Sequence, residues 1–137
     1  MYTTFVPFAE ASTNAMMRSY LQYTGANHAD AFGANAWAAG IFLRDVVNDI
    51  VSKDGKNGVT RAAVLATAAT IHTFTADGML GETDVGRHLP TPCFALLQVR
   101  NGKFVRVYPT QPGTMDCNPS NLVTVTIDPV AAAAAIK

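Results

Sequence analysis

Two cysteines and a nearby histidine are the residues best suited to chemistry in this 137-residue chain. Cys93 and Cys117 are its only cysteines, and His88 precedes Cys93 by five positions. A thiol beside an imidazole is the arrangement of a cysteine nucleophile and its base. Two cysteines that meet in the fold form a disulfide instead. They are too far apart in sequence to be the paired ligands of a zinc knuckle, which lie about two to four residues apart.

A predicted β-hairpin decides between these two uses of Cys93. The segments 93–99 and 104–109 have strand composition and flank Asn101-Gly102, the strongest short signal for a type I′ turn. If Arg100 faces Lys103, the ladder places Cys93 opposite Thr110.

The segment 111–116 can then return Cys117 to the same edge of the sheet. We therefore favour a Cys93–Cys117 disulfide over a Cys93/His88 hydrolase. Such a bond would stabilise the fold by roughly 3 kcal/mol and implies an oxidising compartment.

The remaining polar candidates are weaker. A metal site would recruit His28 with Asp30 or His72 with Asp77, but neither pair has the i,i+4 spacing that places two ligands on one helix face. We therefore predict no metal site, and no cofactor is implied.

Acid/base chemistry is a further alternative in the long loop 75–92. Glu82 and Asp84 lie there beside Arg87, but isolated loop carboxylates more often cap turns or remain solvated. The "DGMLG" stretch of this loop lacks the glycine spacing and the Lys of a phosphate-binding loop. We therefore predict no catalytic residues.

The elements that must position these residues follow a β-α-α-α-β-β-β order. We expect a strand over Thr3–Val6, a helix capped by Ser12 or Thr13, and a long helix capped by Asp30 and ending near Lys53. Thr60 is expected to cap a third helix that ends near Phe74. After the hairpin, a final half-buried strand is expected to alternate Val123, Val125 and Ile127 with Thr124 and Thr126, and the tail 130–137 is a frayed turn or a remnant.

The long helix is predicted to carry two adjacent apolar rows. Helical periodicity places Phe42, Val46 and Ile50 in one row. The second row contains Leu43, Val47 and Val51.

Composition narrows the function classes. The chain has ten basic and ten acidic residues, and 49% of its residues are hydrophobic. A net charge of zero gives no field that favours nucleic acid or an anionic membrane, so we predict no nucleic-acid partner. No apolar run approaches the ~20 residues of a membrane span. The low supply of charge suggests that some apolar faces belong against another segment or chain.

Taken in order, these segments resemble the C-terminal portion of the type I periplasmic-binding family, which includes the branched-chain amino-acid receptors of ABC transporters. The resemblance covers at least Tyr2 to Cys117. It rests on "YTTFVPF" before a helix, "NAWAAGIFLRDVV", "VTRAAVLATAATIHTF", "DGMLGETDVGR" and the hairpin "FALLQVRNGKFVRVYP".

The resemblance implies an α/β fold that is a partial type I periplasmic-binding fold, made of a strand, three helices, a β-hairpin and a final strand. It would be incomplete without upstream residues or a partner chain, with Met1 replacing a longer N-terminal part. Residues 1–25 and 90–127 would be elements of the C-terminal lobe, and the helices of 30–74 would pack on the N-terminal lobe.

The same resemblance implies the function. The parent would be an extracytoplasmic, non-enzymatic receptor that captures a small amino-acid-like solute for an ABC permease. Trp37, where the family often has Tyr, and Asn35 would lie near the ligand. Because the Phe42 to Val51 surface would be uncovered, we expect homo-oligomers or strand exchange. The alternative function is a standalone interaction module that self-associates.

Overall fold

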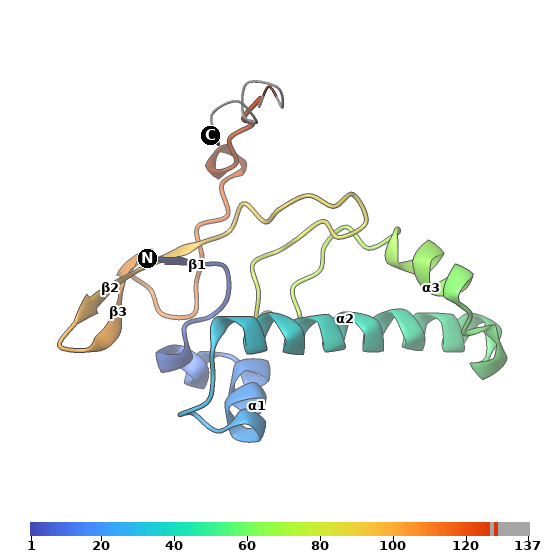
Figure 1. Ribbon diagram of the computed structural model, residues 1–137, viewed down its shortest axis with the longest axis horizontal. Coiled ribbons are helices and arrows are strands. Elements are labelled where there is room, and N and C mark those ends of the chain that lie inside the picture. Colours follow the sequence, from blue (N-terminus) through green and yellow to red (C-terminus); the bar gives the residue numbers. More distant parts are fainter. Residues whose placement is uncertain (127, 129–137) are drawn as a thin grey trace, which may run out of the picture.

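The computed structural model describes residues 1–126 and 128 of the chain (Figure 1). It mixes helices with a three-stranded antiparallel sheet, and the broad α/β prediction is confirmed. In chain order the elements are β1 Tyr2–Thr3, the 3₁₀-helix η1 Phe8–Thr13, α1 Ala15–Thr24, α2 Ala31–Asp54, η2 Lys56–Gly58, α3 Arg61–Ala68, β2 Ala95–Arg100, β3 Lys103–Tyr108 and η3 Pro119–Asn121.

Helix α2 is the axis on which the other elements are arranged. The sheet and η1 lie at its N-terminal end, α1 packs beside its first half, and α3 lies back along its C-terminal end (Figure 1). The sheet therefore does not cover the length of α2. None of the helices in the described part of the chain is long and apolar enough to cross a bilayer.

The junction of α1 and α2 is built around Tyr20. Its side chain is 1% exposed, and its hydroxyl donates to the Asp30 carbonyl (3.0 Å) and accepts from the Asp30 amide (3.1 Å). Gly33 allows this close approach, because a Cβ there would lie 2.5 Å from the tyrosine oxygen. The buried cluster around this contact consists of Val6, Met17, Tyr20, Ala34, Ala38, Ile41, Ala76 and Met79.

Two of the three predicted helix caps are confirmed. The Asp30 carboxylate accepts from the Gly33 amide (2.7 Å) at the start of α2. The Thr60 hydroxyl accepts from the Ala63 amide (3.1 Å) at the start of α3. Short polar side chains at these positions satisfy amide groups that have no partner inside the helix.

The other helix boundaries correct the sequence prediction. The cap of α1 is Asn14, whose side chain accepts from the Met17 amide (2.8 Å), whereas Ser12 and Thr13 belong to η1. Helix α3 ends at Ala68 and not near Phe74, because Phe74 exchanges two backbone hydrogen bonds with Thr83 (2.9 and 3.0 Å).

The hairpin forms at the predicted turn, but its register changes further along. Asn101 and Gly102 both have positive φ (49° and 73°), and Arg100 faces Lys103. A shift between Leu96 and Leu97 then moves the pairing by one residue. The predicted pairing of Cys93 with Thr110 is therefore wrong: Phe94 bridges to Asp116 instead.

The predicted final strand is absent from residues 122–126. Val123 and Val125 are 81% and 71% exposed and belong to no sheet. The sheet consists of β1, β2 and β3, and residues 122–126 pair with neither of its edge strands, β1 or β3. Ile127 and the tail 130–137 lie outside the described residues. The first strand is also shorter than predicted, since β1 is only Tyr2–Thr3.

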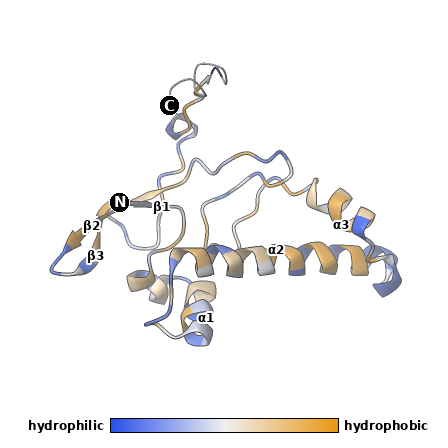
Figure 2. Cartoon of the chain, in the orientation of Figure 1, coloured by the Kyte–Doolittle hydropathy of each residue, from blue (hydrophilic) through white to orange (hydrophobic). Residues whose placement is uncertain are grey.

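The two apolar rows of α2 differ in their surroundings. Val46 and Ile50 are 1% and 2% exposed, so the first row is covered. Phe42 of that row makes an edge-to-face contact with Phe74, with ring centroids 5.1 Å apart. In the second row Leu43 and Val51 are exposed, as is Leu65 on α3. Figure 2 shows the hydrophobic character that runs along both helices.

Candidate functional site

A hollow between α1 and α2 contains one of the two residues that the resemblance places near a ligand. Its volume is about 670 Å³, within the range of small-molecule sites. Tyr20 and Tyr23 contribute from α1, and Trp37 and Arg44 contribute from α2. The hollow follows from the small residues Ala36 and Gly40 of α2, which leave space beside these larger side chains.

Trp37 is held in place by aromatic contacts on both sides. Its ring packs edge-on against Tyr20 (centroids 5.9 Å, interplanar angle 63°) and stacks with Tyr23 (5.8 Å, 29°). Its indole Nε1 is buried and has no hydrogen-bond partner among the described residues. An unsatisfied buried donor is costly and rare, but this nitrogen is shielded and is therefore not a group that the hollow offers to a ligand.

Arg44 at the rim is not available as an anion receptor. It donates from Nε to Asp45 (2.8 Å) and from Nη2 to Asp77 (3.1 Å), and these hydrogen bonds raise the pKa of the guanidinium above its ordinary value. The cluster of one cation and two carboxylates carries a net charge of −1. The rim therefore favours a neutral or zwitterionic molecule over a simple anion.

Asn35, the second proposed ligand residue, lies outside the hollow. Its side chain is exposed and donates to the Ala31 carbonyl one turn earlier in α2 (2.9 Å). The structure does not bring it together with Trp37. Sequence reasoning missed Tyr23 and Arg44, although Tyr20 and Tyr23 stand three residues apart on one predicted helix, a spacing that places them on the same face.

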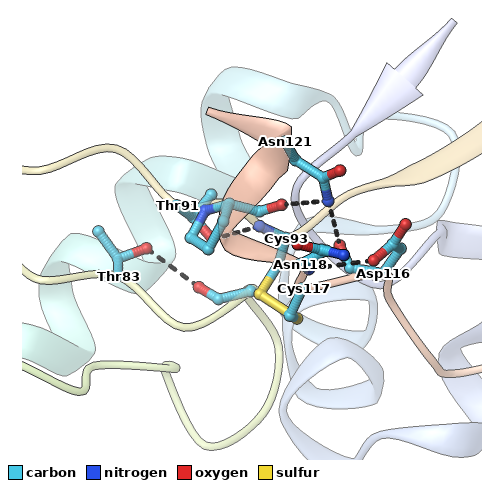
Figure 3. The surroundings of a disulfide bond; sticks show 9 residues. Thr83, Thr91, Cys93, Asp116, Cys117, Asn118 and Asn121 are labelled. Atoms are coloured by element: carbon cyan, nitrogen blue, oxygen red, sulfur yellow. Dashed lines mark hydrogen bonds between the residues drawn. A yellow bond between two sulfur atoms is a disulfide. The ribbon is translucent and has the colours of Figure 1, made fainter. Parts of the chain in front are cut away.

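The predicted Cys93–Cys117 disulfide is present. Figure 3 shows that the bond links the residues just before β2 to the segment that precedes η3. Beside it, Asn121 of η3 donates to the carbonyls of Pro92 (3.0 Å) and Asp116 (3.4 Å). Cys93 is 1% exposed. Because both thiols are used in this bond, the alternative in which Cys93 and His88 form a nucleophile and its base is wrong for the oxidised chain.

The loop carboxylates form local contacts. Asp84 lies 2.7 Å from Nδ1 of His72 and accepts from the Arg87 amide (2.9 Å). The hydrogen bond with His72 lowers the pKa of Asp84 below its ordinary value. His72 therefore contacts Asp84 and not Asp77, the partner considered for a metal site. Among residues 1–126 and 128, no three His, Cys, Asp or Glu side chains are grouped for metal binding.

Comparisons with known proteins give no family for this chain. No protein-family model, no curated protein and no solved structure matches it.

Proposed function

We propose that this chain is part of an extracytoplasmic solute-binding protein that holds a small amino-acid-like molecule and delivers it to an ABC permease. The observation that carries the proposal is the aromatic wall of the hollow between α1 and α2, where Trp37 packs against both Tyr20 and Tyr23. The apolar part of a bound solute would contact these aromatic rings.

The finer fold belongs to the same proposal. In a type I periplasmic-binding fold, the exposed row of α2 and the exposed Leu65 of α3 would lie against a β-layer supplied by the other lobe. Support comes from the position of the chain's own sheet, which lies at one end of α2 and leaves Leu43 and Val51 uncovered (Figure 1). Burial of each such side chain would contribute about 1.5–3 kcal/mol.

The disulfide supports the proposed location. Disulfides persist in oxidising compartments and are rare in the reducing cytosol. A protein that meets its solute outside the cytoplasm would keep the Cys93–Cys117 bond closed.

The first prediction concerns solute binding at Trp37. Titration with a panel of amino acids and their amides should give a saturable change in the fluorescence of this single tryptophan. The change is expected because a solute in the hollow alters the surroundings of the indole ring that lines it. Fluorescence titration, followed by calorimetry on the responding compound, measures it.

The substitution Trp37→Phe replaces the indole with a smaller ring and removes part of the aromatic wall, so it should weaken calorimetric binding about tenfold. Asn35→Ala is the matched control on the same helix, and it should bind as the wild type does because Asn35 lies outside the hollow. A panel without any saturable response would remove the hollow as the solute site.

A second candidate function is a self-associating interaction module. The specific observation in its favour is the exposed second row of α2, where Leu43 is 53% and Val51 is 39% exposed. Contiguous apolar surface of this kind marks protein contacts, and a second copy of the chain would cover it.

The second prediction tests this surface. The wild type should sediment at micromolar concentration as a mixture of monomer and dimer, and Leu43→Glu should shift it to monomer because a charge cannot be buried in the contact. Gln22→Glu on α1 adds the same charge at an exposed position outside this row and should leave the mixture unchanged. A sharp wild-type monomer peak would argue against self-association.

A further inference from the structure

A second cavity lies between the hairpin, the first strand and the start of α2. Its volume is about 670 Å³, and it is separate from the Trp37 hollow. Its apolar lining includes Phe5, Phe8, Leu97, Phe104 and Val105. These residues come from three parts of the sequence, so the cavity exists only in the folded chain.

The walls of this cavity are fixed by contacts that do not depend on a ligand. Phe5 and Phe8 stack with ring centroids 5.4 Å apart and an interplanar angle of 22°. On the other side, Arg106 of β3 forms two hydrogen bonds with the Glu10 carboxylate (2.5 and 2.7 Å), which hold η1 against the sheet. A cavity with such supports is largely preformed, which lowers the entropic cost of binding.

One charged group at the cavity is uncommitted. The Thr3 hydroxyl donates to the Phe5 carbonyl (3.1 Å), and the Asp30 carboxylate caps α2 through the Gly33 amide (2.7 Å). The N-terminal ammonium group of Met1 donates to the Leu97 carbonyl (3.1 Å), whereas the side-chain ammonium group of Lys103 makes no hydrogen bond or ion pair within the described part of the chain. The cavity therefore combines an apolar, aromatic wall with one side-chain ammonium group, that of Lys103, which has no partner among the described residues.

We propose that this cavity binds a small carboxylic acid with an apolar, preferably aromatic, body. The carboxylate would pair with Lys103, and the body would contact the phenylalanine rings. The volume suits small molecules, and a charge-assisted contact at the edge of an apolar wall provides orientation. This site is independent of the solute site at Trp37.

Calorimetry with phenylacetate and its neutral isostere phenylacetamide tests the proposal on the intact, oxidised chain. The wild type should bind the acid about tenfold more tightly than the amide, because only the acid pairs with the ammonium group. Lys103→Gln should remove this preference. Arg100→Gln, at the facing position of the same turn, is the matched control and should retain it.

The location of binding has its own readout. In NMR titrations with phenylacetate, the amide signals of Phe104 and Ala31 should shift, and Trp37→Phe should bind the acid as the wild type does. That result would separate this cavity from the Trp37 hollow even if no solute were found for the hollow. Equal binding of acid and amide would overturn the proposal. Absence of binding, or shifts confined to residues around Trp37, would overturn it too.

Discussion

Replacing Arg106 with methionine should destabilise the chain by roughly 3–5 kcal/mol, because it strands a buried carboxylate. The Arg106 and Glu10 side chains are only 7% and 13% exposed. Besides its two bonds to Glu10, Arg106 donates to the carbonyls of Pro109 (3.2 Å) and Thr114 (2.9 Å). Equilibrium urea unfolding followed by circular dichroism would measure the loss.

Arg44→Met provides the matched control. Arg44 also pairs with two partners, at 2.7 Å from Asp45 and 3.1 Å from Asp77, but its side chain is 47% exposed. Solvent screens such pairs, so the expected loss of stability is much smaller than for Arg106→Met. Similar losses for the two arginine variants would contradict the importance assigned to burial of the Arg106–Glu10 pair.

The same pair predicts a dependence on pH. Burial alone would raise the pKa of Glu10, but the hydrogen bonds from Arg106 and the Gly113 amide, together with the charge of Arg106, lower it overall. The pair's contribution is therefore fully present above the ordinary carboxyl pKa and is lost as pH falls through the lower native pKa. In the Arg106→Met variant the buried Glu10 carboxylate has lost its charged partner, and protonation in acid removes the stranded charge. The difference in the free energy of unfolding between the wild type and the variant should therefore become smaller as the pH falls.

Opening the Cys93–Cys117 disulfide should cost roughly 3 kcal/mol by the chain-entropy estimate. The bond closes a loop over a sequence separation of 24 residues that contains both hairpin strands. The double variant Cys93→Ala with Cys117→Ala should therefore unfold at a lower temperature than the oxidised wild type. Alanine is chosen at position 93 because this side chain is 1% exposed, so the replacement must be small and apolar.

A reductant separates the bond from the substitutions. It should lower the unfolding temperature of the wild type towards that of the double variant and leave the double variant itself unchanged. If the wild type unfolded at the same temperature with and without reductant, the bond would not be a stabilising link in the folded chain.

Much of the local structure could be predicted from the sequence, because local features determine it. Asp30 and Thr60 cap helices since a short oxygen-bearing side chain reaches the first free amides. Asn101-Gly102 makes the hairpin turn because these residues tolerate positive φ. The hairpin turn also led to the Cys93–Cys117 pairing, which is confirmed, although the predicted register that placed Cys93 opposite Thr110 is wrong.

Tertiary contacts decided the rest. The alternation of Val123 and Val125 indicates a strand only when the segment lies beside another strand, and residues 122–126 pair with none of the three. The exchange between Phe74 and Thr83 ends α3 early, and the bulge beside Leu96 changes the register; neither has a local signal.

Residue types and spacing determined the caps, the turn and the amphipathic rows, because these depend on neighbours within a few positions. Only the tertiary structure placed Trp37 between two tyrosines, engaged Arg44 with two carboxylates, and joined Glu10 to Arg106 across 96 positions. Such contacts depend on which distant segments meet when apolar surface is buried. The spacing of apolar residues along the chain does not indicate which segments these are.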